Sequence, residues 1–372
     1  MAKINVVHIC DKFGMRGSTI HGVSRLFAWW FPRFDRDKFN VKLYALKHPD
    51  SSSRALEAEG VSMTYLGKSA LNPTVLTTFL SLIKREKADV LHLHGWIAAN
   101  FGRVAGRLAG IPTIMHEHGV DPSFPMSQRI ADKLVSPFNH IAVAVSKSVR
   151  DFIIANRSVR PWKIRTIYNG APLDEFSPAE PKLVASVREE FGIPPECRAI
   201  GTIGRLDTQK GITYFLQAAA KMMSPDIRFL IVGDGPKRQE LEDEAKDLGL
   251  GSNVIFAGHR SDIAAVQTLL DIQVFPSLWE GTPLTVFEAL AMGKAIVSTN
   301  VDGLAEVLVD GESALIVEPS NPDQLADGIQ RVFSNPNLAD QLRAGAVTQS
   351  KKFDISQTVR NLESLYEELC AR

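Results

Sequence analysis

Residues 271–293 read DIQVFPSLWEGTPLTVFEALAMG, and this stretch holds one complete strand, loop and helix. The run IQVFPS is rich in the residue types that favour a strand. Thr282 and Pro283 predict a helix N-cap followed by a proline at the first helical position, and Gly293 stands where a glycine closes a helix. The stretch therefore predicts a buried strand that leads through a short loop into a helix.

Similar strand-like runs alternate with helical stretches along the whole chain, the pattern of parallel sheets covered by helices on both faces. In the first half, strands are predicted at 4–10, 40–46, 61–66, 89–94, 113–117, 141–145 and 165–168. In the second half, strands are predicted at 199–205, 227–233, 253–257, 272–276, 295–298 and 314–317. Two such series predict an α/β protein with two Rossmann-like domains, whose ligand site lies at the carboxyl ends of the strands.

A linker rich in Pro and charge, near 174–182, separates the two series. It places the first domain at residues 1–177 and the second at 178–354. The last segment, ISQTVRNLESLYEELC, carries five apolar residues at helical spacing, namely Val359, Leu362, Leu365, Tyr366 and Leu369. It predicts an amphipathic helix at about 355–372 that docks onto another part of the protein.

Composition excludes several classes of protein. With 372 residues the chain is longer than a protein with a single hydrophobic core usually is. Its content of 45% hydrophobic residues is too high for a disordered protein. No apolar run approaches the roughly 20 residues of a membrane-spanning helix, and MAKINVVHICDK is typical of a first strand and not of a signal peptide. Cys10, Cys197 and Cys370 form no C-x-x-C pair, so a cytoplasmic location is expected.

The formal net charge is zero, but it is unevenly divided. Residues 1–177 hold 24 Lys and Arg against 14 Asp and Glu, whereas residues 178–372 hold 18 against 28. The basic half is expected to face an anionic partner. Attraction between the two domains across a cleft explains the division equally well.

Two glutamates lie near the start of the helix that is predicted in residues 271–293. Glu280 lies in the loop and Glu288 lies inside the helix, so the break between them lets both carboxylates reach one ligand. Ionised carboxylates only accept hydrogen bonds, which suits hydroxyl-rich ligands such as a ribose and a hexose. The helix start at 281–285 has N–H groups that suit a phosphate. Two solvated surface glutamates are the alternative for either residue alone.

The segment TIGRLDTQKG, residues 202–211, ends a strand at Gly204 and places two cations in the following loop. Arg205 offers a planar fork and Lys210 a point charge, and both suit a diphosphate. Downstream, Gly233 in LIVGDGP ends another strand in a glycine-rich turn. That turn either admits a ligand closely or is a plain tight turn.

These residues resemble the family 4 retaining glycosyltransferases, also described as glycosyl transferases group 1, which have the GT-B fold. The resemblance is carried by GRLDTQKG, VGDGP, EGTPLTVFE, DGLAE at 302–306 and IYNGAPLDEF at 167–176. It covers nearly the whole chain, and the two glutamates spaced E-x7-E are its most specific part. It implies two Rossmann-like domains facing across a cleft, with a terminal helix that crosses back to the first domain.

The resemblance also implies roles for individual residues. Arg205 and Lys210 would hold the nucleotide diphosphate, Glu280 the donor sugar and Glu288 the ribose. His118 in HEHGV matches the family's active-site histidine and would contact a donor hydroxyl or help place the acceptor. The implied catalytic residues are His118, Arg205, Lys210 and Glu280. The implied donor-binding residues are Gly22, Gly204, Arg205, Lys210, Gly233, Glu280, Gly281, Thr282, Pro283, Leu284 and Glu288.

Two segments depart from the family's pattern. HGVSR keeps Gly22 of a G-G-x-x-R-like loop but has His21 in place of the first glycine, after the unusual lead FGMRGSTI. DGLAE lacks one glycine and the proline of the family's G-G-x-P-E, and a similar backbone path is expected.

The expected activity is transfer of a hexose-type sugar from a nucleoside-diphosphate sugar, UDP-sugar favoured over GDP-sugar, to a saccharide or lipid-linked acceptor. The family's retaining mechanism implies that the departing diphosphate takes the acceptor proton, so no cofactor and no metal are expected. Cell-surface polysaccharide or glycolipid synthesis would fit. No nucleic-acid partner is expected. The basic first domain would contact the inner face of an anionic membrane through residues 125–138, 103–107 and 83–87.

Other functions are also open. A non-hydrolysing nucleotide-sugar epimerase of the same fold would hold a diphosphate without an acceptor, and a catalytically silent binding protein would not need the four charged residues. The pair His92 and His94, with the pair in HEH, could assemble the metal centre of a hydrolase, although no Asp, Glu or Cys completes the shell. No G-x-G-x-x-G follows either first strand, which disfavours an NAD enzyme.

Overall fold

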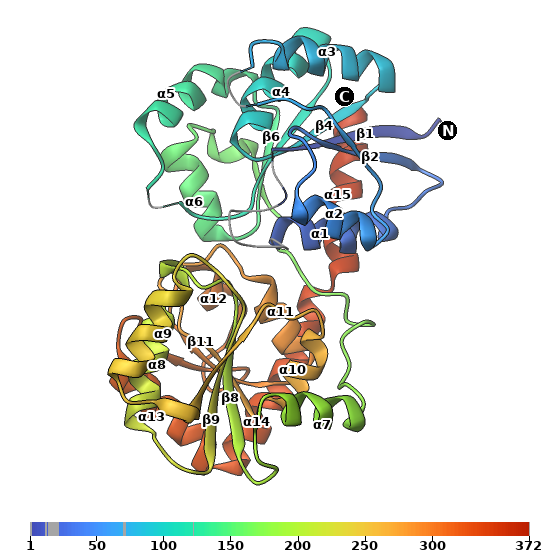
Figure 1. The fold of residues 1–372 in the computed structure, drawn as a ribbon. Coiled ribbons are helices and arrows are strands. Elements are labelled where there is room, and N and C mark those ends of the chain that lie inside the picture. The colour runs from blue at the N-terminus through green and yellow to red at the C-terminus, as the bar shows by residue number, and fades with distance from the viewer. Residues whose placement is uncertain (1, 12, 14–21, 70–71, 122, 372) are drawn as a thin grey trace. The chain divides into compact units, whose positions relative to one another are not determined.

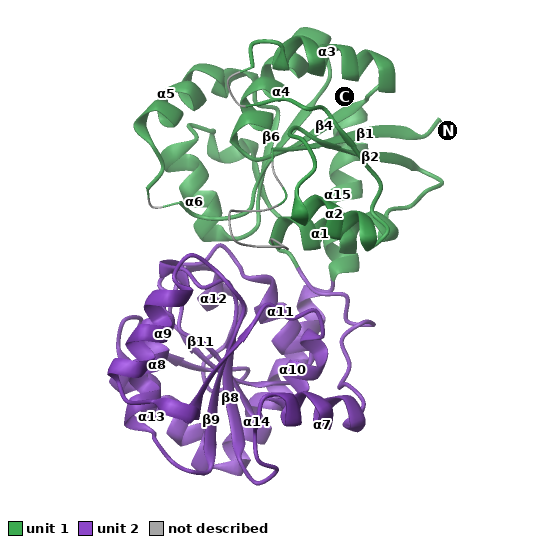
Figure 2. Ribbon diagram, in the orientation of Figure 1, with its two compact units in different colours: residues 1–169, 355–372 green, residues 170–354 purple. Residues whose placement is uncertain are grey.

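The computed structural model describes residues 2–11, 13, 22–69, 72–121 and 123–371. It divides into two compact units, shown in Figure 2: unit 1 is Met1–Asn169 with Ile355–Arg372, and unit 2 is Gly170–Asp354. Along the chain, unit 1 thus first ends at Asn169, shortly before the boundary expected at 177. Unit 2 ends at Asp354, and Ile355 begins the second segment of unit 1.

Unit 1 is built on a seven-stranded sheet in the order β3-β2-β1-β4-β5-β6-β7, in which every pair is parallel. Figure 1 draws the ribbon and labels the strands β1, β2, β4 and β6 of this unit. Its strands are β1 Ile4–Cys10, β2 Phe39–Ala45, β3 Met63–Tyr65, β4 Val90–His94, β5 Thr113–Glu117, β6 Ile141–Ala144 and β7 Ile164–Thr166. The α-helices are α1 Gly22–Trp30, α2 Ser51–Ala58, α3 Val75–Glu86, α4 Trp96–Ala109, α5 Met126–Val135, α6 Lys147–Asn156 and α15 Ile355–Cys370. Strand order reverses beside β1, between β2 and β4.

Alternation along β1 and β4 gives this sheet two different faces. Val7, Ile9 and Leu93 join an apolar core with residues of α3 and α4. The intervening residues, which include His8 and His92, point to the other face, where β1 and β4 contact α15. One face is therefore hydrocarbon, and the other is lined by buried histidines.

The C-terminal helix α15 packs on the other elements of unit 1, as the resemblance implied. It contacts β1, β4 and α1, and the Thr358 hydroxyl donates to the Tyr168 carbonyl at 2.9 Å. All five residues of the predicted apolar stripe are buried, with Leu362 and Tyr366 fully excluded from solvent. The stripe docks as expected from its helical spacing.

Unit 2 has a six-stranded parallel sheet in the order β10-β9-β8-β11-β12-β13. Its strands are β8 Arg198–Ile203, β9 Ile227–Val232, β10 Val254–Gly258, β11 Ile272–Phe275, β12 Ala295–Thr299 and β13 Leu315–Val317. Its α-helices are α7 Pro181–Glu190, α8 Ile212–Lys221, α9 Arg238–Asp247, α10 Ile263–Leu269, α11 Leu284–Ala291, α12 Asp302–Val307, α13 Pro322–Ser334 and α14 Pro336–Ser350. Apolar clusters cover both faces of this sheet. The strand order reverses between β8 and β11.

The thirteen predicted strands are all present and overlap the predicted ranges. The predicted helix start is wrong by one residue, because Pro283 is extended (φ −71°, ψ 135°) and itself occupies the N-cap position of α11. Gly293 ends that helix as expected, at φ +59° with its N–H bonded to the Leu290 carbonyl. Among the described residues, no helix combines the length and the apolar character that crossing a bilayer requires.

Candidate functional site

In unit 2 the predicted donor residues gather where β8 and β11 end, beside the point of reversed strand order. Such a point is where open α/β sheets bind ligands. After β8 the chain passes Gly204 and Arg205 and makes a 3-10 turn at Thr208–Lys210. Gly211 follows at φ +60°, and a Cβ there would lie 2.0 Å from the Pro276 carbonyl oxygen. Only glycine permits this contact, which holds the β8 loop against the end of β11.

An ion pair joins the two loops. Lys210 Nζ lies 2.5 Å from Glu280 Oε1, and the Ser277 hydroxyl donates to the same oxygen at 2.8 Å. Gln209 Nε2 donates to Glu280 Oε2 at 3.1 Å and to the Trp279 carbonyl at 3.0 Å. Glu280 is only 3% exposed, and three donors hold its carboxylate in place.

These bonds leave limited capacity on the Glu280 carboxylate. A carboxylate has about four acceptor positions, and three are occupied by Lys210, Ser277 and Gln209. The remaining position is on Oε2, which can accept one hydroxyl. The residue predicted to bind the donor sugar can therefore do so without breaking its bonds to the protein.

The start of α12 holds the other side of the Glu280 loop. Gly303 donates its N–H to the Glu280 carbonyl at 3.2 Å, and a Cβ on Gly303 would lie 1.8 Å from the Gly281 carbonyl oxygen. The DGLAE segment thus keeps a glycine where the backbones meet. Its path supports the loop directly, despite the missing proline.

Gly233 and Gly235 serve a close approach of backbone to backbone. A Cβ on Gly233 would lie 1.9 Å from the Gly204 carbonyl oxygen, and one on Gly235 would lie 2.3 Å from the Leu206 carbonyl oxygen. Leu206 also donates its N–H to the Asp234 carbonyl at 3.0 Å. Of the two interpretations of this turn, the described contacts support the structural one.

The remaining predicted donor residues differ in how accessible they are. Arg205 is partly exposed, with Nη1 3.6 Å from Asp207 Oδ2. Glu288 is fully buried within α11, and Thr282 and Leu284 at the helix start are nearly so. Pro283 has no N–H, so the N–H groups offered by 281–285 come from the other four residues.

In unit 1 the predicted active-site residue, His118, follows β5 and is half-buried. It ends a continuous chain of hydrogen bonds, which we call the imidazole chain. In order, its members are His118, His94, His8, Tyr366, His92 and His116. The successive links measure 2.9, 3.0, 3.2, 2.8 and 2.9 Å.

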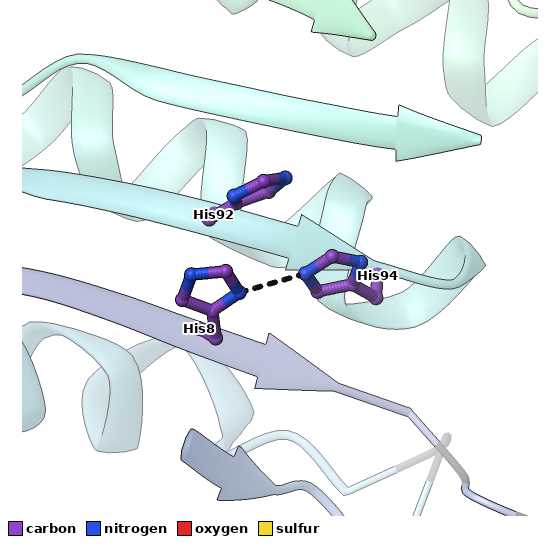
Figure 3. A group of neighbouring side chains, drawn as sticks. All are labelled: His8, His92 and His94. Atoms are coloured by element: carbon purple, nitrogen blue, oxygen red, sulfur yellow. Dashed lines mark hydrogen bonds between the residues drawn. The ribbon is translucent and has the colours of Figure 1, made fainter. Parts of the chain in front are cut away.

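Figure 3 shows three members of this chain, His8, His92 and His94, on the neighbouring strands β1 and β4. Burial lowers the pKa of His8 to about 3 and lowers the pKa of His92, His94 and His116 well below the usual value. These imidazoles are therefore neutral at pH 7. Two sets of three offer nitrogens within 4.8 Å of one another: His8, His92, His94 and His94, His116, His118.

A buried charge network lies beside the His118 loop. Asp132 on α5 is fully buried and pairs with Arg103 and Arg157, and Arg157 also pairs with Glu117, the residue before His118. Burial raises the pKa of Glu117. Arg157 thus links α5 to the end of β5, and removing one member of the network would leave an uncompensated buried charge.

Gly22, the matching glycine of HGVSR, is the first residue of α1. His21 and most of the FGMRGSTI lead lie outside the described residues.

Sequence reasoning missed several site residues. Gln209 and Ser277 were overlooked because polar loop residues carry no periodic signal. His8 stands alone in the apolar strand VVHIC, and Tyr366 was counted only as part of an apolar stripe. Period-two alternation in β1 could have placed His8 on the same sheet face as the β4 histidines.

Two family models match the chain. The one described as Glycosyltransferase Family 4 matches residues 20–175, and the one described as Glycosyl transferases group 1 matches residues 185–349. The UDP-Gal:alpha-D-GlcNAc-diphosphoundecaprenol alpha-1,3-galactosyltransferase of Escherichia coli is 29% identical, with 98% of this chain and 97% of that protein covered. The 2-deoxystreptamine glucosyltransferase of Streptomyces kanamyceticus is 27% identical, with 92% of each covered.

Solved structures share the fold. A glycosyltransferase from Rickettsia africae superposes with a TM-score of 0.85 at 21% identity and covers 99% of each chain. Anabaena HepE in complex with UDP and glucose gives a TM-score of 0.85 at 19% identity, covering 98% of this chain and 99% of that one.

Proposed function

The chain belongs to the family 4 glycosyltransferases of the GT-B fold, and from this premise we propose that it is a retaining hexosyltransferase that uses a UDP-sugar. The observation that carries the proposal is the Lys210–Glu280 pair at the ends of β8 and β11. A cation for a diphosphate and an acceptor for a sugar hydroxyl lie side by side there. UDP is preferred because the E. coli relative is named for UDP-Gal and HepE was solved with UDP.

The residues of unit 2 support stabilisation of a departing diphosphate. Arg205 and Lys210 supply two positive charges near the end of β8, and the start of α11 supplies N–H groups. Charge that develops on the leaving group is stabilised by donors already in place, which is commonly the largest catalytic effect. The diphosphate then takes the acceptor proton, and the transferred sugar keeps its configuration.

Metal independence belongs to the same proposal. Two cations and a helix start offset the charge of the diphosphate, so a divalent ion would add little. The acceptor is proposed to be a saccharide or a lipid-linked saccharide, by analogy with the diphosphoundecaprenol-linked acceptor in the E. coli relative's name.

A panel of nucleotide sugars tests this function. We expect thermal stabilisation and slow hydrolysis with one UDP-sugar, and NMR of the transfer product should show the donor's anomeric configuration. Inversion would refute the mechanism. Formation of an epimerised nucleotide sugar without any acceptor would favour the epimerase.

We also propose that α5 contacts an anionic membrane. Met126, Ile130 and Leu134 are spaced four residues apart and are 66%, 55% and 72% exposed. Lys133 is an exposed cation on the same helix. An exposed apolar stripe beside cations is typical of helices that lie in a bilayer interface.

Part of the candidate membrane face is ruled out. Arg103 is fully buried and pairs with Asp132, so it cannot reach a lipid headgroup. In the segment 83–87, Ile83 is buried, whereas Lys84 and Lys87 are exposed. The proposed face is therefore centred on α5.

Vesicle sedimentation tests the membrane contact. Wild-type protein should pellet with vesicles that contain anionic lipid, remain in solution with neutral vesicles, and be released by moderate salt. Replacing Met126, Ile130 and Leu134 by Gln should abolish pelleting. Leu183→Gln, an exposed apolar residue of unit 2, is the matched control and should pellet normally. Equal pelleting of both variants would refute the contact.

A further inference from the structure

Gln209 holds the loop that carries Glu280 at three successive residues. Its backbone carbonyl accepts from the Leu278 N–H at 2.8 Å. Its amide nitrogen donates to the Trp279 carbonyl at 3.0 Å and to Glu280 Oε2 at 3.1 Å. One residue of the loop after β8 therefore holds both the backbone that follows β11 and one oxygen of the Glu280 carboxylate.

The amide of Gln209 suits this place because both of its side-chain partners are acceptors. A primary amide offers two N–H donors from one nitrogen, whereas a hydroxyl offers one proton and an ionised carboxylate offers none. The reversed amide would turn its oxygen toward a carbonyl and a carboxylate, so the chemistry of the partners determines its orientation. Residue 209 thus acts on Glu280 through its nitrogen.

Ser277 holds the other oxygen of the same carboxylate. Its hydroxyl donates to Glu280 Oε1 at 2.8 Å, and the residue is only 1% exposed. Ser277 is held in turn, because the Thr299 hydroxyl at the end of β12 donates to the Ser277 carbonyl at 2.7 Å. Lys210 also reaches Oε1, but an ammonium on a flexible stem is a point charge without a preferred direction. The orientation of the carboxylate therefore comes from Gln209 and Ser277.

We propose that Gln209 and Ser277 are positioning residues that leave the Glu280 carboxylate one open acceptor, on Oε2, so that the site recognises a single hydroxyl of the donor hexose. A hexose without that hydroxyl leaves a buried acceptor unmet. Hydrogen bonds to charged groups are strong, so the missing hydroxyl should weaken binding roughly ten- to a hundredfold. The identity of the ligand rests on the proposed function, whereas the holding of the carboxylate does not.

Calorimetry with UDP-hexose analogues that each lack one hydroxyl tests the recognition. The penalty of an analogue is the ratio of its dissociation constant to that of the intact UDP-hexose. Gln209→Leu should lower the penalty of one analogue by about tenfold and leave the others unchanged, because the released carboxylate no longer meets that hydroxyl in a fixed direction. Gln217→Leu, which removes an amide 3.3 Å from Glu244 on the same unit, is the matched control and should keep every penalty.

Ser277→Ala should lower the same penalty by less than Gln209→Leu does. Lys210 still bonds to Oε1 in that variant, whereas Gln209→Leu removes the one described donor to Oε2. UDP alone should bind both variants almost as it binds the wild type, because the backbone bonds of the loop remain. Unchanged penalties in Gln209→Leu, or a loss of affinity for UDP that equals the loss for the UDP-hexose, would overturn the proposal.

An exchange of the two side chains tests the contact without any nucleotide sugar. Gln209→Glu places a second carboxylate against Glu280, which is only 3% exposed, so the Tm should fall by about 4 °C or more. Combining it with Glu280→Gln restores one donor and one acceptor, and the double variant should recover most of that loss. Gln217→Glu beside the half-buried Glu244 should cost less, because solvent screens the pair. A double variant no more stable than Gln209→Glu would overturn the contact.

The two experiments separate the proposal from the proposed function. If the exchange restores stability but no UDP-hexose binds the wild type, the proposed function fails with the role in sugar recognition, and the holding of Glu280 stands. If UDP-hexoses bind and their penalties do not respond to Gln209→Leu, the proposed function stands and the positioning role is refuted.

Discussion

Acidification should destabilise unit 1 strongly, because four of its histidines are neutral and buried. The folded-state pKa of His8 is about 3, and those of His92, His94 and His116 are also far below 6.5. In the unfolded chain each would titrate near 6.5 and take up a proton. The unfolded state therefore binds more protons below that value, so the stabilisation is complete above pH 6.5 and is lost as the pH falls toward the folded pKa.

The expected loss is large compared with the stability of a domain. Between pH 7.5 and 5.5, each such histidine costs a little more than about 1 kcal/mol of unfolding free energy, or roughly 5–6 kcal/mol for four. Asp11 offsets part of this, because burial raises its pKa to about 6, and its protonation in the folded state returns about 1 kcal/mol. A net loss of about 4–5 kcal/mol consumes much of the typical 5–15 kcal/mol.

Urea unfolding followed by tryptophan fluorescence measures this loss. Four of the five tryptophans, Trp29, Trp30, Trp96 and Trp162, belong to unit 1, so the signal reports mainly that unit. We expect the unfolding free energy to fall by about 4–5 kcal/mol from pH 7.5 to 5.5. His92→Leu should reduce that difference by roughly one histidine's share, which is a little more than about 1 kcal/mol. A wild-type difference below about 1.5 kcal/mol would refute the reasoning.

The other predictions concern the donor site of unit 2. Arg205→Ala and Lys210→Ala should each reduce the rate of transfer by about a hundredfold or more. Circular dichroism should show that both variants keep the wild-type fold. Near wild-type turnover in both variants would contradict the assignment of these residues to the diphosphate. Calorimetry with UDP should give weaker binding for Glu288→Gln, whereas Glu280→Gln should bind UDP normally and lose transfer; the reverse order would exchange their roles. Gly303→Ala should weaken UDP binding, because the new Cβ would lie 1.8 Å from the Gly281 carbonyl oxygen and would displace the loop that carries Glu280. Unchanged affinity would show that the backbone at this contact can move apart without affecting the site. Transfer should survive exhaustive chelation, and loss of activity that zinc restores would contradict metal independence.

The sheets were predictable from the sequence because buried parallel strands leave a strong local signal. All thirteen strands were located, and the docking stripe of α15 followed from helical spacing alone. The start of α11 was misplaced because Thr282 and Pro283 have favourable local capping chemistry, yet contacts from Gly303, distant in sequence, hold the loop. A difference of one residue is within the usual variation of helix ends.

The donor site was predictable in part. Lys210 and Glu280 were named from their motifs, and the structure brings them into contact at 2.5 Å. Gln209 and Ser277, which hold the carboxylate, were not named, because loop partners that are 71 and 3 residues from Glu280 share no spacing rule. The imidazole chain was predicted only in part. His8 and Tyr366 were not linked to the other histidines, because they come from opposite ends of the amino-acid sequence.

The two segments of unit 1 have a consequence for synthesis on the ribosome. Residues 170–354 form unit 2 without a break, so that unit can fold as soon as it has emerged. Unit 1 begins first but cannot close the histidine-lined face of its sheet until α15 is made, because Tyr366 and Leu362 cover that face. Although residues 1–169 are made first, unit 1 can reach its final structure only after α15 has been made. A polypeptide that ends before Ile355 would hold all of unit 2 but would leave the histidine-lined face of unit 1 without its covering helix.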